Sequence, residues 1–215
     1  GDDIEKKRAN AIKILGRFLY KEMAKTDLRL VSFNSGKMHN AIPRDGRFVI
    51  AVPNADKEMI RADWNIHASE VEDEFHVSDV QMVFNMESTD GDKVIDKSSS
   101  DKFIRSIQAV DNGVFAMCQD EALSWMVETS SNVASVITES DKITVVASQR
   151  SNVMSNLDNQ CNTVKATFEL AGAKVIQNDG YPAWKMRANS ELTKITSDTY
   201  RELFGKEPLV KGIHA

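Results

Sequence analysis

The chain has 215 residues, enough for one large domain or two small ones. Its 41% hydrophobic and 27% charged residues lie near the averages of globular proteins, which excludes a wholly disordered or fibrous chain. The net charge of −5 provides no basic field that would gather nucleic acid or anionic lipid. We therefore expect neither a nucleic-acid nor a membrane partner.

Cysteine content and terminal sequences bear on location and completeness. The two cysteines, Cys118 and Cys161, are too few for a disulfide scaffold and lack the paired spacing of a zinc knuckle. No run approaches the about 18 apolar residues of a membrane span, and no signal-peptide pattern is present. These features favour the cytoplasm. A helical pattern starts almost at once after Gly1, and the chain stops at a turn-like ending at 212–215, so we expect both ends to be cut from a longer protein.

The first half of the sequence predicts alternating helices and strands. Apolar residues recur at three- and four-residue steps from Ile4 to Ala24, which predicts an amphipathic helix. After it we expect strands at 27–32 and 47–52, a polar helix at 54–75, a strand at 80–86 and a loop at 87–100. The narrow apolar face of the 54–75 helix indicates that it covers a sheet edge or the solvent side.

The second half repeats this order of elements. We expect a helix at 101–110, strand-like residues around 131–135, a turn at 139–141, a strand at 142–147, a helix capped by Asn152 and stopped by Gly172, and a strand at 174–177. The repeat predicts two tandem α+β units whose strands share one antiparallel sheet. Beyond Pro182 we expect one helix ending at Gly205 and a strand at 206–215, which together cannot bury their own apolar faces and so imply a partner domain.

Few residues in the sequence form a pattern that carries chemistry. The four histidines, His39, His67, His76 and His214, lack the spacing of a zinc site. We interpret His67 and His76, with the acidic run at 70–74, as solvent-exposed side chains of a polar helix. Neither a G-x-S-x-G elbow nor a glycine-rich phosphate loop occurs, and both cysteines are interpreted as core thiols. The residues alone therefore indicate no catalytic centre.

Two positions remain candidates for ligand binding. Asn40 opens the string Asn-Ala-Ile-Pro at 40–43, where the proline fixes a turn that would hold the amide at the end of a strand. The alternative is an asparagine that only caps its own turn. Arg150 lies at the expected junction between a strand and a helix, where its guanidinium could face a carboxylate. A surface arginine without a ligand is the alternative there.

Several strings, taken in order, resemble one family. They are Gly-Asp-Asp-Ile at 1–4, Arg-Ala-Asn-Ala-Ile-Lys-Ile-Leu-Gly-Arg-Phe-Leu at 8–19, Asn-Ala-Ile-Pro-Arg at 40–44, Val-Glu-Thr-Ser-Ser-Asn-Val-Ala-Ser-Val at 127–136, Ser-Gln-Arg-Ser at 148–151, Leu-Ala-Gly-Ala-Lys at 170–174, Gly-Tyr-Pro-Ala-Trp-Lys at 180–185 and Gly-Ile-His-Ala at 212–215. This combination resembles the bacterial aminoacyl-histidine dipeptidases, also called Xaa-His or β-alanyl-histidine dipeptidases.

The resemblance implies a fold and a domain organisation. The family is related to aminoacylases and carboxypeptidases and has a metal-binding catalytic domain interrupted by a lid, which is doubled in this branch. Residues 1–90 and 91–180 would be two ferredoxin-like α/β lid subdomains, with an antiparallel sheet covered by helices on one face. Residues 181–215 would begin the second catalytic segment. The family's H-x-D motif, Glu-Glu pair and late histidine ligand have no counterpart here, so the two divalent metal ions (zinc, or cobalt or manganese instead) are expected only in the parent protein.

The resemblance also assigns substrate-binding roles. Asn40 matches the asparagine of the family's Asn-x-Ile-Pro turn, and Arg150 matches the arginine of its Gln-Arg-Ser string. When the lid closes, Arg150 would clamp the substrate carboxylate, and Asn40 would hydrogen-bond the substrate or the developing oxyanion. His214 lies beside the catalytic centre in the family, and the resemblance leaves its role open.

Two functions of different classes follow from the sequence. The first is the lid and substrate-binding segment of a cytosolic metal-dependent dipeptidase that acts on Xaa-His dipeptides, inactive by itself and with a closure or dimer surface. The alternative is a free-standing α+β interaction module, without a catalytic role, that dimerises through a sheet edge. The two differ in whether a catalytic domain accompanies this chain.

Overall fold

The computed structural model of the protein describes residues 3–91, 93–184, 187 and 190–211. Its α-helices are α1 (Ala11–Glu22), α2 (Lys57–Glu74), α3 (Lys97–Ala109), α4 (Met154–Leu170) and α5 (Glu191–Phe204), and its 3-10 helices are η1 (Ile4–Lys6), η2 (Asn54–Asp56) and η3 (Glu121–Leu123). Its strands are β1 (Arg29–Ser35), β2 (Gly46–Ala51), β3 (Gly113–Met117), β4 (Val127–Thr138) and β5 (Ile143–Ser151).

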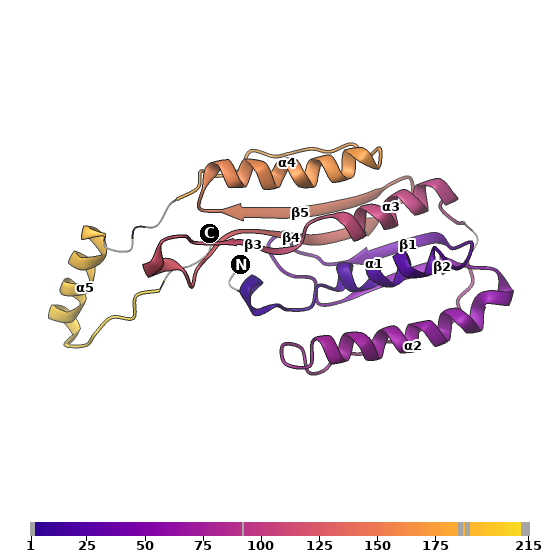
Figure 1. Cartoon of the computed structure of the whole chain (residues 1–215), viewed down its shortest axis with the longest axis horizontal. Coiled ribbons are helices and arrows are strands. Elements are labelled where there is room, and N and C mark those ends of the chain that lie inside the picture. The colour runs from indigo at the N-terminus through magenta and orange to yellow at the C-terminus, as the bar shows by residue number, and fades with distance from the viewer. Residues whose placement is uncertain (1–2, 92, 185–186, 188–189, 212–215) are drawn as a thin grey trace.

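The five strands form a single antiparallel sheet (Figure 1). β2, β1, β4 and β3 follow one another, and β5 pairs with β4 along the length of β4. The two halves of the chain meet where Ser35 of β1 pairs with Val136 of β4. The predicted α+β class with one antiparallel sheet is confirmed.

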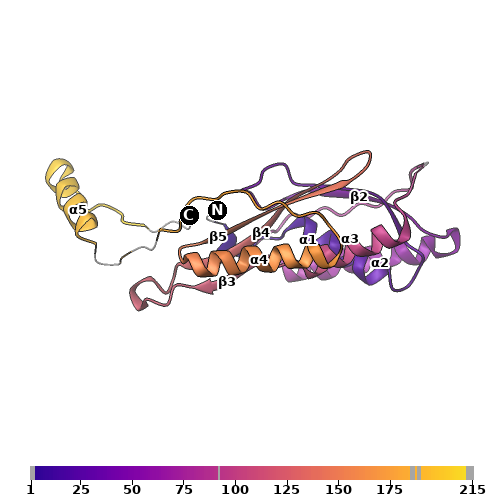
Figure 2. The ribbon, with the colours of Figure 1, turned by 90° about the horizontal axis from the view of Figure 1, so that it is seen from above.

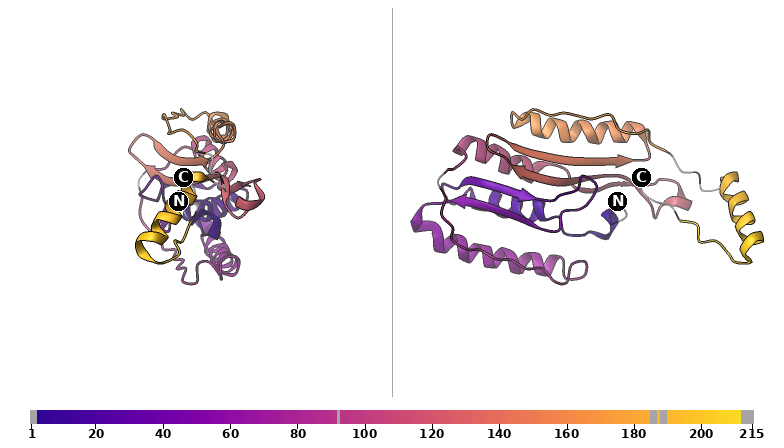
Figure 3. Two further views of the ribbon diagram at one scale, coloured as in Figure 1. Left: turned by 90° about the vertical axis from the view of Figure 1, so that its left-hand side faces the viewer. Right: turned by 180° about the vertical axis from the view of Figure 1, so that it is seen from behind.

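Helices α1 to α4 lie on one face of the sheet and leave the other face open (Figure 2). α2 and α4 lie toward opposite edges, with α1 and α3 between them (Figure 3). The core fills the space between this helix layer and the sheet, because strand residues of alternating positions point toward the helices. Its fully or almost fully buried side chains are Ile12, Leu15, Phe18, Leu19, Leu28, Leu30, Phe33, Ile60, Trp64, Ile104, Ile107, Val110, Val133, Val136 and Val164.

The first predicted helix is shorter than the apolar pattern indicates. η1 ends at Lys6, its C-cap Lys7 has a left-handed φ of 51°, and α1 begins only after Asn10. The Asn10 side chain caps α1 by accepting hydrogen bonds from the backbone N–H groups of Ile12 and Lys13. The prediction of one helix over 4–24 was therefore wrong at its start, because a buried capping residue separates the two helical segments.

Three predicted strands are not assigned among the described residues. Residues 80–86 and 174–177 contain no strand, and neither does 206–211, the described part of the strand predicted at 206–215. In 80–86 the alternation is real, since Phe84 packs its ring on Trp64 at 5.7 Å while Val80 and Val83 are exposed. Alternating burial needs only a neighbouring core, whereas a strand also needs backbone pairing. Conversely, β3 was not predicted.

The segment that carries Arg150 also differs from the prediction. β5 runs on to Ser151, so Arg150 lies within a strand and not at its junction with a helix. Asn152 does not cap α4, whose N-cap is Val153. Its amide instead donates to Cys118 Sγ at 3.2 Å, and the Ser151 hydroxyl accepts from the Val153 N–H at 3.0 Å. A longer ladder with β4 therefore moves the cap and the start of the helix by one residue.

α5 stands apart from the sheet and its helices (Figure 1). It has the predicted amphipathic pattern and ends at Gly205 with a left-handed φ of 62°. None of its residues is buried, and Leu192, Ile195, Leu203 and Phe204 are all exposed. Among the described residues, no helix is both long and apolar enough to cross a membrane.

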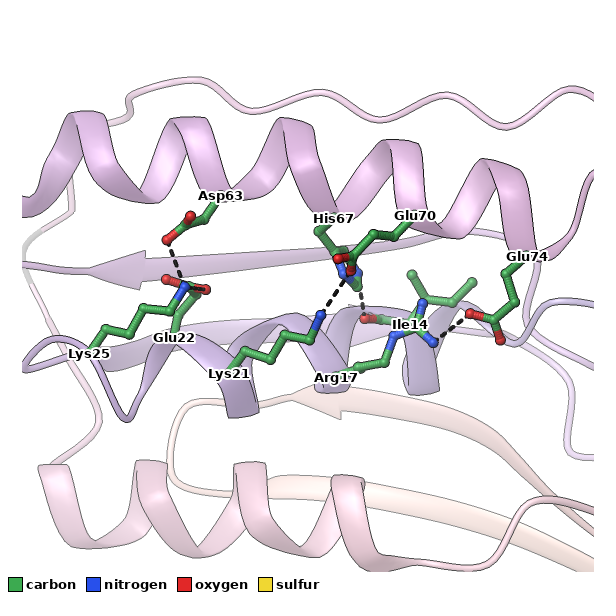
Figure 4. A network of polar contacts seen from close by, with 9 residues as sticks. All are labelled: Ile14, Arg17, Lys21, Glu22, Lys25, Asp63, His67, Glu70 and Glu74. Atoms are coloured by element: carbon green, nitrogen blue, oxygen red, sulfur yellow. Dashed lines mark hydrogen bonds and ion pairs between the residues drawn. The ribbon is translucent and has the colours of Figure 1, made fainter.

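α1 and α2 are joined by polar contacts around a buried histidine (Figure 4). Two ion pairs link the helices, Arg17 to Glu74 at 2.6 Å and Lys21 to Glu70 at 2.8 Å, and Lys25, just after α1, pairs with Asp63 of α2 at 2.8 Å. Beneath them His67 is only 2% exposed, so the prediction of a solvent-exposed histidine was wrong. Its Nε2 donates to the Ile14 carbonyl at 3.1 Å, and the buried Nδ1 has no partner among the described residues.

His67 should make the stability of the protein depend on pH. Burial, followed by the charges of Arg17 and Lys21, holds the pKa of His67 below its ordinary value of 6.5, while Glu70 opposes this shift. The unfolded chain therefore binds a proton at a pH where the folded protein does not, and the stability contributed by neutral His67 is lost as pH falls below 6.5. The free energy of unfolding should then fall by at most about 1.4 kcal/mol per pH unit.

Urea unfolding of the chain and of a His67→Gln variant between pH of about 7.5 and about 5.5 measures this contribution. The variant should have a flatter pH profile. Burial also raises the pKa of Glu22, which sits with Lys25 and Asp63 in the same interface and acts in the opposite sense. Because Glu22 is retained in the variant, the difference between the two profiles isolates His67. Identical slopes would contradict the assignment.

Candidate functional site

Asn40 lies in the turn that connects β1 to β2. The turn starts at Gly36, whose φ is +72° and where a Cβ atom would overlap the Ala134 carbonyl oxygen of β4. Only glycine fits this combination of conformation and close approach. Asn40 itself is exposed, and within the described residues its side chain makes no hydrogen bond of its own. The amide is therefore available to a ligand from the turn.

Arg150 lies on β5 and faces the open side of the sheet. Successive strand residues alternate between faces, and Val145 and Ala147 pack against the core on the helix side. Arg150 therefore shares the open side with Ser148. Across the ladder, Arg150 pairs with Ser130 and Ser148 pairs with Asn132 of β4. These four polar residues form one patch on two neighbouring strands.

Asn40 and Arg150 line one continuous cavity. It has a volume of about 2110 Å³ and extends from the open face of the sheet, around β2, to residues 78–91. Ser130, Asn132 and Ser148 also line it, as do the basic side chains Arg44 and Arg47. Carboxylates, among them Asp45 and Asp79, line other parts of the cavity. Around Arg150 the lining combines a guanidinium group with neutral hydrogen-bonding side chains, which suits a carboxylate ligand.

The described residues do not supply a metal site. No group of three or more His, Cys, Asp or Glu side chains among them is arranged to hold a metal ion. The donor set that a co-catalytic pair of divalent ions requires is therefore not met by this part of the chain. The third candidate, His214, lies outside the described residues.

Sequence reasoning missed Asn132, Ser130 and Ser148 as members of the site. The signal was the run Thr-Ser-Ser-Asn at 129–132, polar residues in what proved to be the central strand of the sheet. Polar side chains in a central strand need partners, because they are taken out of water. Ser131 accepts from Gln149 at 3.2 Å, and the Thr129 and Ser151 hydroxyls are hydrogen-bonded at 2.9 Å.

Comparison with known proteins identifies relatives of the chain. No family model matches it. The cytosol non-specific dipeptidase of Escherichia coli (strain K12) is 32% identical over 216 residues, which cover 100% of this chain and 44% of that protein. The crystal structure of aminoacylhistidine dipeptidase from Vibrio alginolyticus matches with a TM-score of 0.90 and 34% identity, again over 100% of this chain and 44% of the other.

The resemblance found in the sequence is thus confirmed. The chain is homologous along its whole length to a segment of these dipeptidases, and it has the same fold as that segment of the Vibrio alginolyticus structure. It spans less than half the length of either relative.

Proposed function

We propose that this chain is the lid and substrate-binding segment of a cytosolic metal-dependent dipeptidase that hydrolyses Xaa-His dipeptides. The homology to two dipeptidases supports the reaction class, and their names suggest the location and the substrate. The observation that carries the proposal is that Asn40 and Arg150, from opposite halves of the chain, line the same cavity. Two residues that the sequence matched to substrate-binding positions thus open onto one cavity.

The two side chains have complementary chemistry toward a dipeptide. The guanidinium of Arg150 can form two parallel hydrogen bonds to the free C-terminal carboxylate of a substrate. The amide of Asn40 can donate to the scissile carbonyl oxygen, where negative charge develops during attack by water. Because both residues belong to the lid, they would act on the substrate only when the lid meets the catalytic domain.

In the parent protein, this chain would supply the lid and the start of a catalytic segment, and the remainder would supply the metal site. Residues 1–90 and 91–180 form the two lid subdomains, and residues 181–215 begin a catalytic segment. The exposed apolar face of α5 fits this division, since a helix of this kind needs a partner to cover it. Residues outside this chain would hold the two divalent ions, zinc or alternatively cobalt or manganese, which polarise the scissile carbonyl and activate water when bound.

Activity of this chain should depend on the rest of the parent protein. The purified chain, supplied with zinc, cobalt or manganese, should not hydrolyse β-alanyl-histidine, because its described residues hold no metal site. The product of the complete open reading frame should hydrolyse it and lose the activity on chelation. Release of free histidine, followed by chromatography, measures both.

Two outcomes would overturn this proposal. One is hydrolysis by this chain alone that survives a chelator-treated control preparation. The other is a complete gene product that, loaded with each metal, cleaves no member of a panel of Xaa-His dipeptides. The second result would favour the free-standing interaction module instead.

A further inference from the structure

Three asparagines meet where α1 begins, beside the central strand. The buried Asn10 amide donates from Nδ2 to Asn112 Oδ1 at 3.0 Å, to Asn132 Oδ1 at 3.2 Å and to the Val133 carbonyl at 2.9 Å. Asn112 Oδ1 in turn accepts from the Val133 N–H at 3.0 Å. This asparagine cluster joins α1, the connection from α3 to β3, and β4. Asn10 and Asn112 together pair both backbone groups of Val133, next to a register shift in β4.

The cluster also reaches the turn that carries Asn40. Asn132 Nδ2 donates to the Ala41 carbonyl at 2.8 Å, and the Ala11 N–H, next to Asn10, donates to the Pro43 carbonyl at 3.0 Å. The turn is thus tied to β4 and to the start of α1 by the two carbonyls that flank Ile42. Since the Asn40 side chain makes no hydrogen bond of its own within the described residues, its position depends on these backbone ties.

We propose that Asn132 is a positioning residue that holds the Asn40 turn in place relative to Arg150. The inference rests on the proposed function of Asn40 and Arg150. Asn132 lies on the same face of β4 as Ser130, two residues away, and Ser130 is the ladder partner of Arg150. One side chain therefore links the turn of one half of the chain to the strand pair that carries the arginine of the other half.

The two hydrogen bonds of Asn132 use both ends of its amide. Asn132 accepts from Asn10 through Oδ1 while it donates to Ala41 through Nδ2, because a carboxamide carries its acceptor and its donor on two separate atoms. An aspartate would keep the acceptor and lose the donor. It would also place a negative charge against the Ala41 carbonyl oxygen.

Further hydrogen bonds join the elements around the cluster. The ammonium of Lys13, in the first turn of α1, donates to the carbonyls of Ile107 at 2.6 Å, Gln108 at 3.0 Å and Val110 at 2.8 Å. Burial lowers the pKa of Lys13 to about 8, with Asp111 opposing the shift. These bonds fix the end of α3 against α1, and Asn112 follows two residues after Val110. Hydrogen bonds therefore join α1, the end of α3 and β4 around the cluster.

A double-mutant cycle in the full-length dipeptidase tests the assignment. Asn132→Ala should lower kcat/KM for β-alanyl-histidine by roughly 10- to 100-fold, and it should move the same parameter, kcat or KM, that Asn40→Ala moves. Asn132→Asp should lower kcat/KM by a similar factor, and it replaces Asn132→Ala in the test if the alanine variant does not fold. The Asn132→Ala, Asn40→Ala double variant should stay within about 2-fold of Asn40→Ala, because Asn132 acts only through Asn40.

Asn34→Ala is the matched control. Asn34 is an exposed asparagine of β1 whose Oδ1 accepts from the Thr138 N–H of β4 at 2.9 Å, so its loss also removes one bond between strands. It does not touch the turn, and kcat/KM should stay within about 2-fold of the parent. Urea unfolding of every variant separates stability from activity.

The outcomes distinguish this inference from the proposed function. If Asn40→Ala and Arg150→Ala lower kcat/KM but the effect of Asn132→Ala adds in full to that of Asn40→Ala, the positioning role is wrong and the proposed function stands. If Asn132→Ala or Asn132→Asp leaves kcat/KM unchanged, the positioning role is again wrong. If Asn40→Ala and Arg150→Ala have no effect, the proposed substrate site fails and the inference fails with it.

Discussion

Arg150→Ala in the full-length dipeptidase proposed above should lower kcat/KM by roughly 30- to 1,000-fold, equivalent to about 2–4 kcal/mol of transition-state binding. The reason is the loss of a bidentate partner for the substrate carboxylate on the open face of β5. Steady-state kinetics with β-alanyl-histidine, at substrate concentrations on both sides of KM, measure the change. Arg150→Lys should recover only part of it, because an ammonium keeps the charge but not the planar fork.

Arg105→Ala is a suitable control for this result. Arg105 is an exposed arginine of α3, on the helix side of the sheet, so its removal changes the net charge equally without touching the cavity. An amidated dipeptide gives a second check, since a substrate without the carboxylate should bind the Arg150→Ala variant and the parent equally well. Unchanged kcat/KM for Arg150→Ala would remove Arg150 from the site.

Phe18→Ala should destabilise the chain by about 3–5 kcal/mol. Phe18 is 1% exposed, and its ring meets those of Trp64 at 4.9 Å, His67 at 5.4 Å and Phe48 at 5.9 Å. Truncation would lose buried apolar area and these ring contacts, and it would leave a cavity between α1, α2 and β2. The melting temperature should fall by roughly 6–20 °C for a protein of this size.

Tyr20→Ala provides the comparison for Phe18→Ala. Tyr20 lies two residues further along α1 and is 41% exposed, so its truncation should change the unfolding free energy by no more than about 0.5 kcal/mol. Urea unfolding followed by circular dichroism measures both variants. A loss below about 1 kcal/mol for Phe18→Ala would show that this ring is not at the centre of the core.

Local sequence patterns predicted most helices but not all of their limits. The apolar stripe with Phe18 and Leu19 predicted α1, and the three- and four-residue spacing with Val164 and Phe168 predicted α4. Helix signals are local, since they depend on side chains within one or two turns. The start of α1 was missed because Asn10 is held by partners on β4 and after α3, which are distant in the sequence.

Strands were predicted wrongly where their existence depends on backbone pairing with a distant strand. Residues 80–86 alternate as a strand does, yet the structure assigns them none. β3 lacks a clear pattern, since Val114, Phe115 and Met117 are all exposed, and it exists because β4 offers it an edge. Pairing partners lie far along the chain, so the periodicity of one segment cannot determine them.

The buried His67 shows the same limit for single side chains. In the sequence it stands in a polar helix, close to a run of acidic residues, and such a residue is usually exposed. Contact with α1 buries it against Phe18 and Trp64 and gives Ile14 as its hydrogen-bond acceptor. No pattern within α2 reveals which of its residues face another helix when its apolar stripe is narrow.

By itself, the sequence determined the α+β class, most helices, the kinship with dipeptidases and the two candidate residues Asn40 and Arg150, because each of these rests on short strings or local periodicity. Only the tertiary structure decided that both candidates line one cavity, that Asn132 connects the Asn40 turn to the central strand, and that the histidine of α2 is buried. These features depend on contacts between residues about 50 to 120 positions apart, and the free energy of such contacts arises only when the sheet and its helices have come together.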